Sequence, residues 1–157
     1  MQIGEMTLTS TQRVVFGKPA AEAIAAEAER IGAHRVFLLA SGTMREKTDE
    51  ITNIERALGA RHAATFSGIR PHAPRSDVLK AVETARECNI DLIVTIGGGS
   101  GTDAGKIVAL ALKHDVRSVE DFEPLHVYIE ADGTVVNPCT SGPDITTAMR
   151  FMGAVPI

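Results

Sequence analysis

The chain has 157 residues, and its 16 basic and 20 acidic side chains give a formal net charge of −4. It contains neither a basic cluster nor an aromatic platform of the kind that binds nucleic acid, so nucleic acid is not an expected partner. It also lacks an apolar run of about 18 residues and a leader-type amino terminus, which favours a cytoplasmic protein without a membrane segment.

From the amino terminus onward, apolar residues alternate between strand-like and helix-like spacing. We expect a short strand over residues 13–16, a helix over residues 19–31 and a second strand over residues 35–39. Proline near the first turn of this helix and Gly32 after it are typical start and stop signals.

The same alternation continues through residue 96. We expect helices over residues 44–58 and 76–88, and strands over residues 62–66 and 91–96. The last of these strands is continuously apolar, as is typical of a parallel strand buried on both faces. Four strands joined by helices predict a doubly wound α/β fold, with a mostly parallel sheet and flanking helices, in a single domain over residues 1–157.

Beyond residue 113 the alternation ends. Residues 127–129 and 134–136 flank Ala131-Asp132-Gly133, which predicts a small β-hairpin that leaves the main sheet. Residues 155–157 have the pattern of a further strand.

The most informative segment is the glycine-rich run that follows the strand at 91–96. Gly97, Gly98, Gly99 and Ser100 lie between this strand and a new apolar-periodic helix. Glycines allow a close approach of the backbone to an anion, and the first N–H groups of a helix carry the positive end of its dipole. The run therefore predicts a site that binds the phosphate groups of a cofactor.

Two known glycine motifs do not fit this run. A P-loop would require glycine at Ser100 and a hydroxyl residue at Ile107, and the dinucleotide fingerprint would require glycine at Thr102. A purely structural interpretation also exists, because Ser100 as N-cap with Asp103 three residues later has the spacing of a capping box.

The end of the strand at 35–39 bears on the choice of cofactor. In dinucleotide folds an acidic residue at this point binds the ribose hydroxyls and repels a 2′-phosphate. Ser41 and Gly42 stand there instead, so this repulsion is absent and the expected cofactor is NAD or NADP. Arg45, one turn further on, either meets a phosphate or is an ordinary solvated arginine.

At this point the motifs resemble a known family. The run Gly97-Gly98-Gly99-Ser100-x-x-Asp103-x-x-Lys106 is similar to the nucleotide-binding signature of the iron-containing alcohol dehydrogenases, which include the maleylacetate reductases. Val14-Val15-Phe16-Gly17 resembles the opening strand of that family, and Phe66-x-Gly68-x-Arg70-Pro71-His72-x-Pro74 resembles the loop one helix before the glycine motif. The placement of His72 after Leu58-Gly59 favours the maleylacetate reductase branch.

The resemblance implies a Rossmann-like domain of an oxidoreductase that transfers hydride between a nicotinamide cofactor and an alcohol, a carbonyl or a maleylacetate-like small-molecule substrate. It implies that His72 lies beside the cofactor and that Asp103 and Lys106 lie toward the nicotinamide or support the loop. Iron or zinc is implied only for a helical second domain that this chain does not contain, and a homodimer is the expected assembly. No pair of histidines in the chain has the spacing of a metal site on one helix.

The chain by itself is therefore expected to bind the dinucleotide weakly and to be inactive. Two alternatives from other classes remain. One is a non-catalytic module that binds an adenine nucleotide, and the other is a non-catalytic assembly unit.

Overall fold

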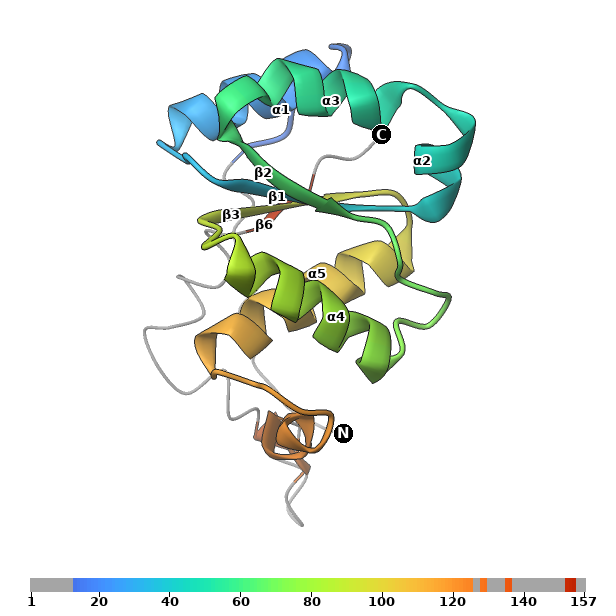
Figure 1. Cartoon of the computed structure of the whole chain (residues 1–157), viewed down its shortest axis with the longest axis vertical. Helices are drawn as coiled ribbons and strands as arrows, with labels where there is room; N and C mark the ends of the chain where they lie inside the picture. Colours follow the sequence, from blue (N-terminus) through green and yellow to red (C-terminus); the bar gives the residue numbers. More distant parts are fainter. Residues whose placement is uncertain (1–12, 126–127, 130–134, 137–151, 155–157) are drawn as a thin grey trace, which may run out of the picture.

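The computed structural model describes residues 13–125, 128–129, 135–136 and 152–154. These residues form a parallel four-stranded sheet between two layers of helices (Figure 1). The strand order is β2-β1-β3-β6. The strands are β1 (Val36–Ala40), β2 (His62–Phe66), β3 (Leu92–Ile96) and β6 (Met152–Ala154).

Two helices cover each face of the sheet. The layer above the sheet in Figure 1 holds α1 (Ala20–Arg30) and α3 (Glu50–Leu58), and the layer below holds α4 (Arg75–Glu87) and α5 (Gly99–Lys113). A short helix, α2 (Gly42–Lys47), lies beyond the end of β1. This arrangement confirms the predicted α/β fold with a parallel sheet and flanking helices.

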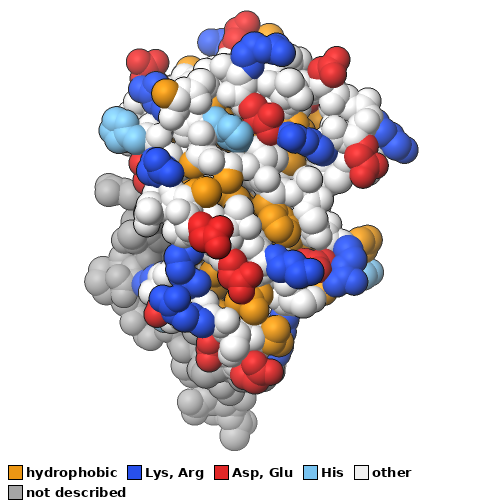
Figure 2. Space-filling model, viewed as in Figure 1, with side chains coloured by type: hydrophobic (Ala, Val, Ile, Leu, Met, Phe, Trp, Pro, Cys, Tyr) orange, Lys and Arg blue, Asp and Glu red, His pale blue; other side chains and the backbone are white. Residues whose placement is uncertain are grey.

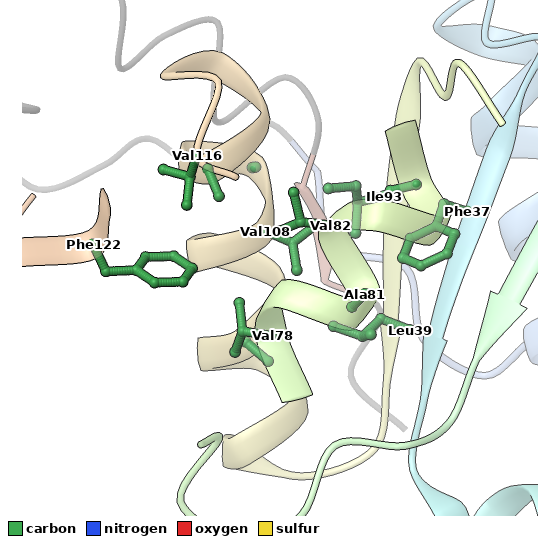
Figure 3. Packing of buried hydrophobic residues seen from close by; sticks show 13 residues of the cluster. Phe37, Leu39, Val78, Ala81, Val82, Ile93, Val108, Val116 and Phe122 are labelled. Atoms are coloured by element: carbon green, nitrogen blue, oxygen red, sulfur yellow. The ribbon is translucent and has the colours of Figure 1, made fainter. Parts of the chain in front are cut away.

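The core has two halves because successive strand residues point to opposite faces. Val36, Leu38 and Ala40 pack among the residues of α1 and α3. Phe37 and Leu39 pack against Val78, Ala81 and Val82 of α4 and Val108 of α5, as Figure 3 shows. All five residues of β1 and of β3 are buried, as the apolar pattern of these strands predicted.

The expected strand over residues 13–16 is wrong, because these residues pair with no strand among those described. Val14 is 62% exposed and Phe16 is 88% exposed. A short run of apolar β-branched and aromatic residues shows that a segment can form a strand, but a strand also needs a neighbour to pair with. The fourth strand of the sheet is β6 instead, which the sequence pattern did not indicate.

The single helix expected over residues 44–58 is divided into α2 and α3. Thr48 lies between them in an extended conformation, with φ −140° and ψ 160°. Its hydroxyl donates to the Met44 carbonyl at 2.7 Å and accepts from the Glu50 backbone N–H at 3.4 Å. Thr48 therefore ends α2, because its side chain competes with the helix backbone, and Asp49 is the N-cap of α3.

The remaining predicted elements agree with the structure to within one or two residues, and β2 agrees at both ends. A 3₁₀ segment, η2 (Glu120–Leu125), follows α5. The predicted hairpin is present as the antiparallel pair β4 (Tyr128–Ile129) and β5 (Val135–Val136), while residues 155–157 lie outside the described part of the chain. Among the described residues, no helix is both long and apolar enough to span a membrane.

Candidate functional site

The topology of the sheet defines one place where a ligand is expected. From β1 the chain continues to β2 on one side, whereas β3 lies on the other side of β1 and is followed by α5 and β6. In open parallel sheets, ligands bind beyond the carboxyl ends of the strands where the order of connections reverses. Here that place is the pair β1 and β3, whose last residues, Ala40 and Ile96, are aligned in register.

Gly97 follows β3 and packs against Ser41, the residue that follows β1. Its φ is +134°, and a Cβ atom at this position would lie 2.7 Å from Cβ of Ser41. The Ser41 N–H donates to the Ile96 carbonyl at 2.8 Å. Both the backbone angle and the contact therefore require glycine, and they bring Ser41 and the glycine run together as the sequence predicted.

Gly98 and Gly99 differ from Gly97 because none of the described residues requires the absence of their side chains. No heavy atom of the described part of the chain lies within 4 Å of the position that a Cβ atom would occupy on either residue, and both residues are exposed. Gly98 is the N-cap of α5 and Gly99 is its first residue. The start of the helix is therefore an open surface of backbone, which fits a bound phosphate group.

Ser100 is not the N-cap that its spacing to Asp103 predicted. The helix begins at Gly99, and its cap, Gly98, makes no side-chain capping bond. The Gly98 carbonyl accepts from the N–H groups of Gly101 and Thr102 at 3.1 and 3.2 Å. The glycines allow the backbone to turn into the helix two residues earlier than a serine cap would, so the Ser100 hydroxyl is available for another contact.

That contact comes from the loop between β2 and α4. The His72 backbone N–H donates to the Ser100 Oγ at 3.3 Å. A Cβ atom on Gly42 would lie 3.6 Å from the Ser67 carbonyl of the same loop. The connections that follow β1, β2 and β3 therefore meet at one edge of the sheet, at the right of Figure 1. The structure brings Ser41, Gly42 and His72 to the glycine run, and their contact with a cofactor stays a prediction.

Asp103 and Lys106 lie further along α5 and pair with each other. Their side chains are 66% and 60% exposed, and Lys106 Nζ lies 3.4 Å from Asp103 Oδ1. This spacing is that of an ordinary ion pair on a helix surface. The structure does not bring either side chain to the glycines, so their role toward a cofactor stays a prediction.

Arg45 forms an ion pair with Glu55 of α3, and is not an isolated solvated arginine. Glu55 also accepts from the Thr65 hydroxyl at 2.7 Å, and His62 Nε2 lies 2.8 Å from the same hydroxyl. Because the hydroxyl hydrogen is directed to Glu55, His62 Nε2 is the donor in the second bond. Partial burial raises the pKa of Glu55, but the bonds from Thr65 and Arg45 outweigh it and hold the pKa below its usual value.

Gly105 is a residue that the sequence reasoning missed. It lies in the middle of α5, is buried, and a Cβ atom there would lie 2.3 Å from Thr95 Cγ2 of β3. Glycine lets α5 approach the sheet closely, which fixes the start of the helix relative to β3. Its position between the buried residues Ala104 and Val108 was the available signal, since glycine is unfavourable in a helix interior without such a reason.

Charged side chains of both signs are spread over the face of the molecule that Figure 2 displays. Within the described residues, no three His, Cys, Asp or Glu side chains are grouped so that they could hold a metal ion. We therefore assign no metal ligand to this part of the chain.

The fold and this site define a class of protein: a doubly wound α/β domain with a glycine-rich helix start at its switch point. A model of the family described as iron-containing alcohol dehydrogenase matches residues 11–147. The chain belongs to that family, as the resemblance of its motifs predicted.

Relatives with curated names include maleylacetate reductases. Over 107 residues the chain is 37% identical to maleylacetate reductase 2 of Cupriavidus pinatubonensis, and the match covers 68% of this chain and 28% of the relative. The solved maleylacetate reductase of Rhizobium sp. strain MTP-10005 is 31% identical with a TM-score of 0.60, and the match covers 69% of this chain and 30% of that one. These matches agree with the predicted branch of the family.

A third match was solved with a cofactor. The sulfoacetaldehyde reductase of Bifidobacterium kashiwanohense, in complex with NAD⁺, is 25% identical with a TM-score of 0.62, and the match covers 75% of this chain and 31% of that one. The chain thus spans less than a third of the length of these relatives.

Proposed function

We propose that this chain is the NAD(P)-binding domain of an oxidoreductase that transfers hydride between a nicotinamide cofactor and an alcohol, a carbonyl or a maleylacetate-like substrate. The observation that carries the proposal is the open backbone of Gly98 and Gly99 at the β1–β3 switch point. The names of related proteins support it, since they include maleylacetate reductases and an NADH-dependent butanol dehydrogenase.

In this proposal the chain binds and orients the cofactor. The N–H groups at the start of α5 hold the pyrophosphate, and the end of β1 at Ser41 and Gly42 faces the adenosine ribose. His72 lines the same edge from the β2–α4 loop. A nicotinamide cofactor supplies the hydride chemistry when bound, and iron or zinc belongs to residues that the described part of this chain does not provide.

The affinity of this domain alone should be modest. A micromolar complex requires about −8 kcal/mol, whereas an anion at a helix terminus gains roughly 0.3 to 2 kcal/mol. The remainder must come from contacts with the adenine, the ribose and the nicotinamide. Because the chain spans less than a third of its relatives, we propose that part of those contacts, the substrate pocket and a homodimer interface lie in the remaining length of such a protein.

The testing experiment is a calorimetric titration of the chain with NAD, NADH, NADP, NADPH and AMP, repeated with the Gly98→Val variant. Because no atom of the described residues lies within 4 Å of the new Cβ, the variant should fold and should lose dinucleotide binding by at least about tenfold, as the valine fills the surface where the phosphate rests. The control is Ala57→Val, which places the same valine side chain at an exposed position of α3.

Binding that is equal in the parent and in Gly98→Val would overturn the proposed site. AMP binding as tight as NADH binding would favour the alternative of a non-catalytic adenine-nucleotide module. If no ligand binds at millimolar concentration, a longer protein that contains residues 1–157 should be titrated in the same way, and failure there would overturn the proposal.

A further inference from the structure

The loop between β2 and α4 has an unusual backbone. His72 and Ala73 are adjacent and have φ angles of +66° and +47°. Left-handed backbone costs roughly 1 kcal/mol or more for residues other than glycine, and it persists only where the surroundings enforce it. Such residues gather at functional sites, so two in succession beside the start of α5 require an explanation.

Part of the explanation is a tight turn. The Ala73 N–H donates to the Arg70 carbonyl at 3.1 Å, which closes a four-residue turn with Pro71 in second place and His72 in third. Proline in second place and a positive φ in third place are the features of a type II turn. The turn directs the His72 backbone N–H at the Ser100 hydroxyl, 3.3 Å away in the first turn of α5.

The turn is held from its other side by a carboxylate. Asp77 is 4% exposed and lies in the first turn of α4. Its Oδ2 accepts from Arg70 Nε at 2.7 Å and from the Arg70 backbone N–H at 3.2 Å, and its Oδ1 accepts from Arg70 Nη2 at 2.9 Å. Three bonds to one residue, two of them from the planar guanidinium, fix both the backbone and the side chain of Arg70.

These contacts form a continuous chain from α4 to α5. Asp77 holds Arg70, Arg70 opens the turn, and the turn places His72 on Ser100. We propose that Arg70 and Asp77 are positioning residues that hold the Arg70–Ala73 turn against the start of α5 and so shape the edge of the cofactor site. This inference rests on the proposed function for its consequence, while the contacts themselves can be tested without a ligand.

The test uses Arg70→Lys and Asp77→Asn. Lysine keeps the charge but loses the paired geometry, and asparagine keeps the shape but loses the charge. Their matched controls are Arg30→Lys, from the Arg30–Glu27 ion pair on the other face of the sheet, and Asp121→Asn, whose carboxylate accepts from the N–H groups of Arg117 and Ser118 at 2.8 Å.

The first measurement is amide hydrogen exchange of the chain without ligand. In both variants, the amide hydrogens of His72 and of residues 99–102 should exchange up to about tenfold faster than in the parent. This factor is the size expected for the loss of one charge-assisted hydrogen bond. The controls should leave these amides at the parent rate. In the parent, the exchange of these amides relative to their intrinsic rate should accelerate in the same way when acid protonates Asp77. In Asp77→Asn, acid should cause no such acceleration.

The second measurement is the dissociation constant for NADH, which should rise by a similar factor in both variants and in neither control. Unchanged exchange at residues 99–102 in Arg70→Lys and Asp77→Asn would overturn the inference, and so would unchanged NADH affinity in a chain that binds NADH. If the parent binds no NADH, the proposed function fails, but the exchange experiment still decides whether Arg70 and Asp77 position the turn. The Arg70 side chain is 65% exposed, so Arg70→Lys should fold. It therefore tests the inference even if Asp77→Asn, at a buried position, fails to fold.

Discussion

At the scale of single residues, the positive φ of His72 explains which side chains its position tolerates. Glycine adopts this backbone at no steric cost, asparagine adopts it readily, and alanine adopts it at a cost of roughly 1 kcal/mol or more. The contact to Ser100 uses the backbone N–H of His72 and survives any of these substitutions if the turn is kept. The side chain of His72 is exposed and can therefore be tested separately from the turn.

We expect His72→Gly to keep the melting temperature of the parent and to weaken NADH binding by about two- to tenfold, the range of one hydrogen bond to the cofactor. His72→Asn should recover most of the affinity because its amide can replace the imidazole as a hydrogen-bonding group. Calorimetry and a thermal melt of both variants measure the two effects. Equal affinity of His72→Gly and the parent would remove the His72 side chain from the site.

Gly105 gives a second prediction at this scale. Gly105→Ala should destabilise the protein by about 1–3 kcal/mol, because the new Cβ atom overlaps Thr95 Cγ2 and the packed interior cannot move freely. Thr95→Ser removes that methyl group, and the next atoms lie 3.8 Å from the new Cβ. The double variant should therefore be more stable than the sum of the two single variants predicts.

Urea unfolding of the parent, both single variants and the double variant measures this coupling free energy. Additive effects would mean that the close approach of α5 to β3 does not depend on Gly105.

At the scale of elements, α2 is attached to α3 through Arg45 and Glu55. This ion pair is only partly buried, with side chains 43% and 21% exposed. It holds the guanidinium beside α3, one helical turn away from Ser41 at the proposed ribose site. Arg45 is therefore occupied by an acidic partner at the position where a free arginine would favour a 2′-phosphate.

Glu55→Gln should release Arg45 and increase the ratio of NADP to NAD affinity by about two- to fivefold, since exposed ion pairs contribute roughly 0.2 to 1 kcal/mol. Competition titrations with both cofactors measure the ratio, which does not depend on a general loss of stability. Glu50→Gln, at an exposed position of the same helix, is the control. A ratio equal to that of the parent in Glu55→Gln would show that Arg45 does not reach the 2′ position.

At the scale of the whole molecule, three carboxylates make stability depend on pH. The bond from the Arg70 guanidinium lowers the pKa of Asp77, the N–H groups of Arg117 and Ser118 lower the pKa of Asp121, and the bonds from Thr65 and Arg45 lower the pKa of Glu55 despite burial. The unfolded chain therefore binds more protons than the folded chain in acid.

The stabilisation from these groups should be complete above the usual carboxyl pKa of about 4 and should be lost as the pH falls through the lowered values of the folded state. Melting temperatures between neutral pH and about pH 2 should fall steeply at the acid end. The combined Asp77→Asn and Asp121→Asn variant should show a shallower fall. A melting temperature that stays constant or rises in acid would contradict the direction of all three pKa shifts.

The sequence predicted the layered fold because its signals are local. Continuous apolar strands such as residues 92–96 and the glycines that follow them can be recognised without knowledge of their neighbours. The glycine run also predicts a phosphate site, since a strand, a glycine turn and a helix are consecutive in the chain, and this stays a prediction. Sequence alone likewise placed Ser41, Gly42 and His72 after the ends of strands, although Gly42 is the first residue of α2 and not part of a loop.

Tertiary structure decided what depends on partners distant in sequence. The segment at 13–16 has the apolar residues of a strand but pairs with none of the described strands, and Ser100 has the spacing of a cap but accepts a bond from His72, 28 residues earlier. Gly105 is required by Thr95, and Arg45 is held by Glu55. Hydrophobic period and capping spacing describe a segment by itself, whereas strand pairing, close packing and ion pairs depend on which other segment the fold places beside it.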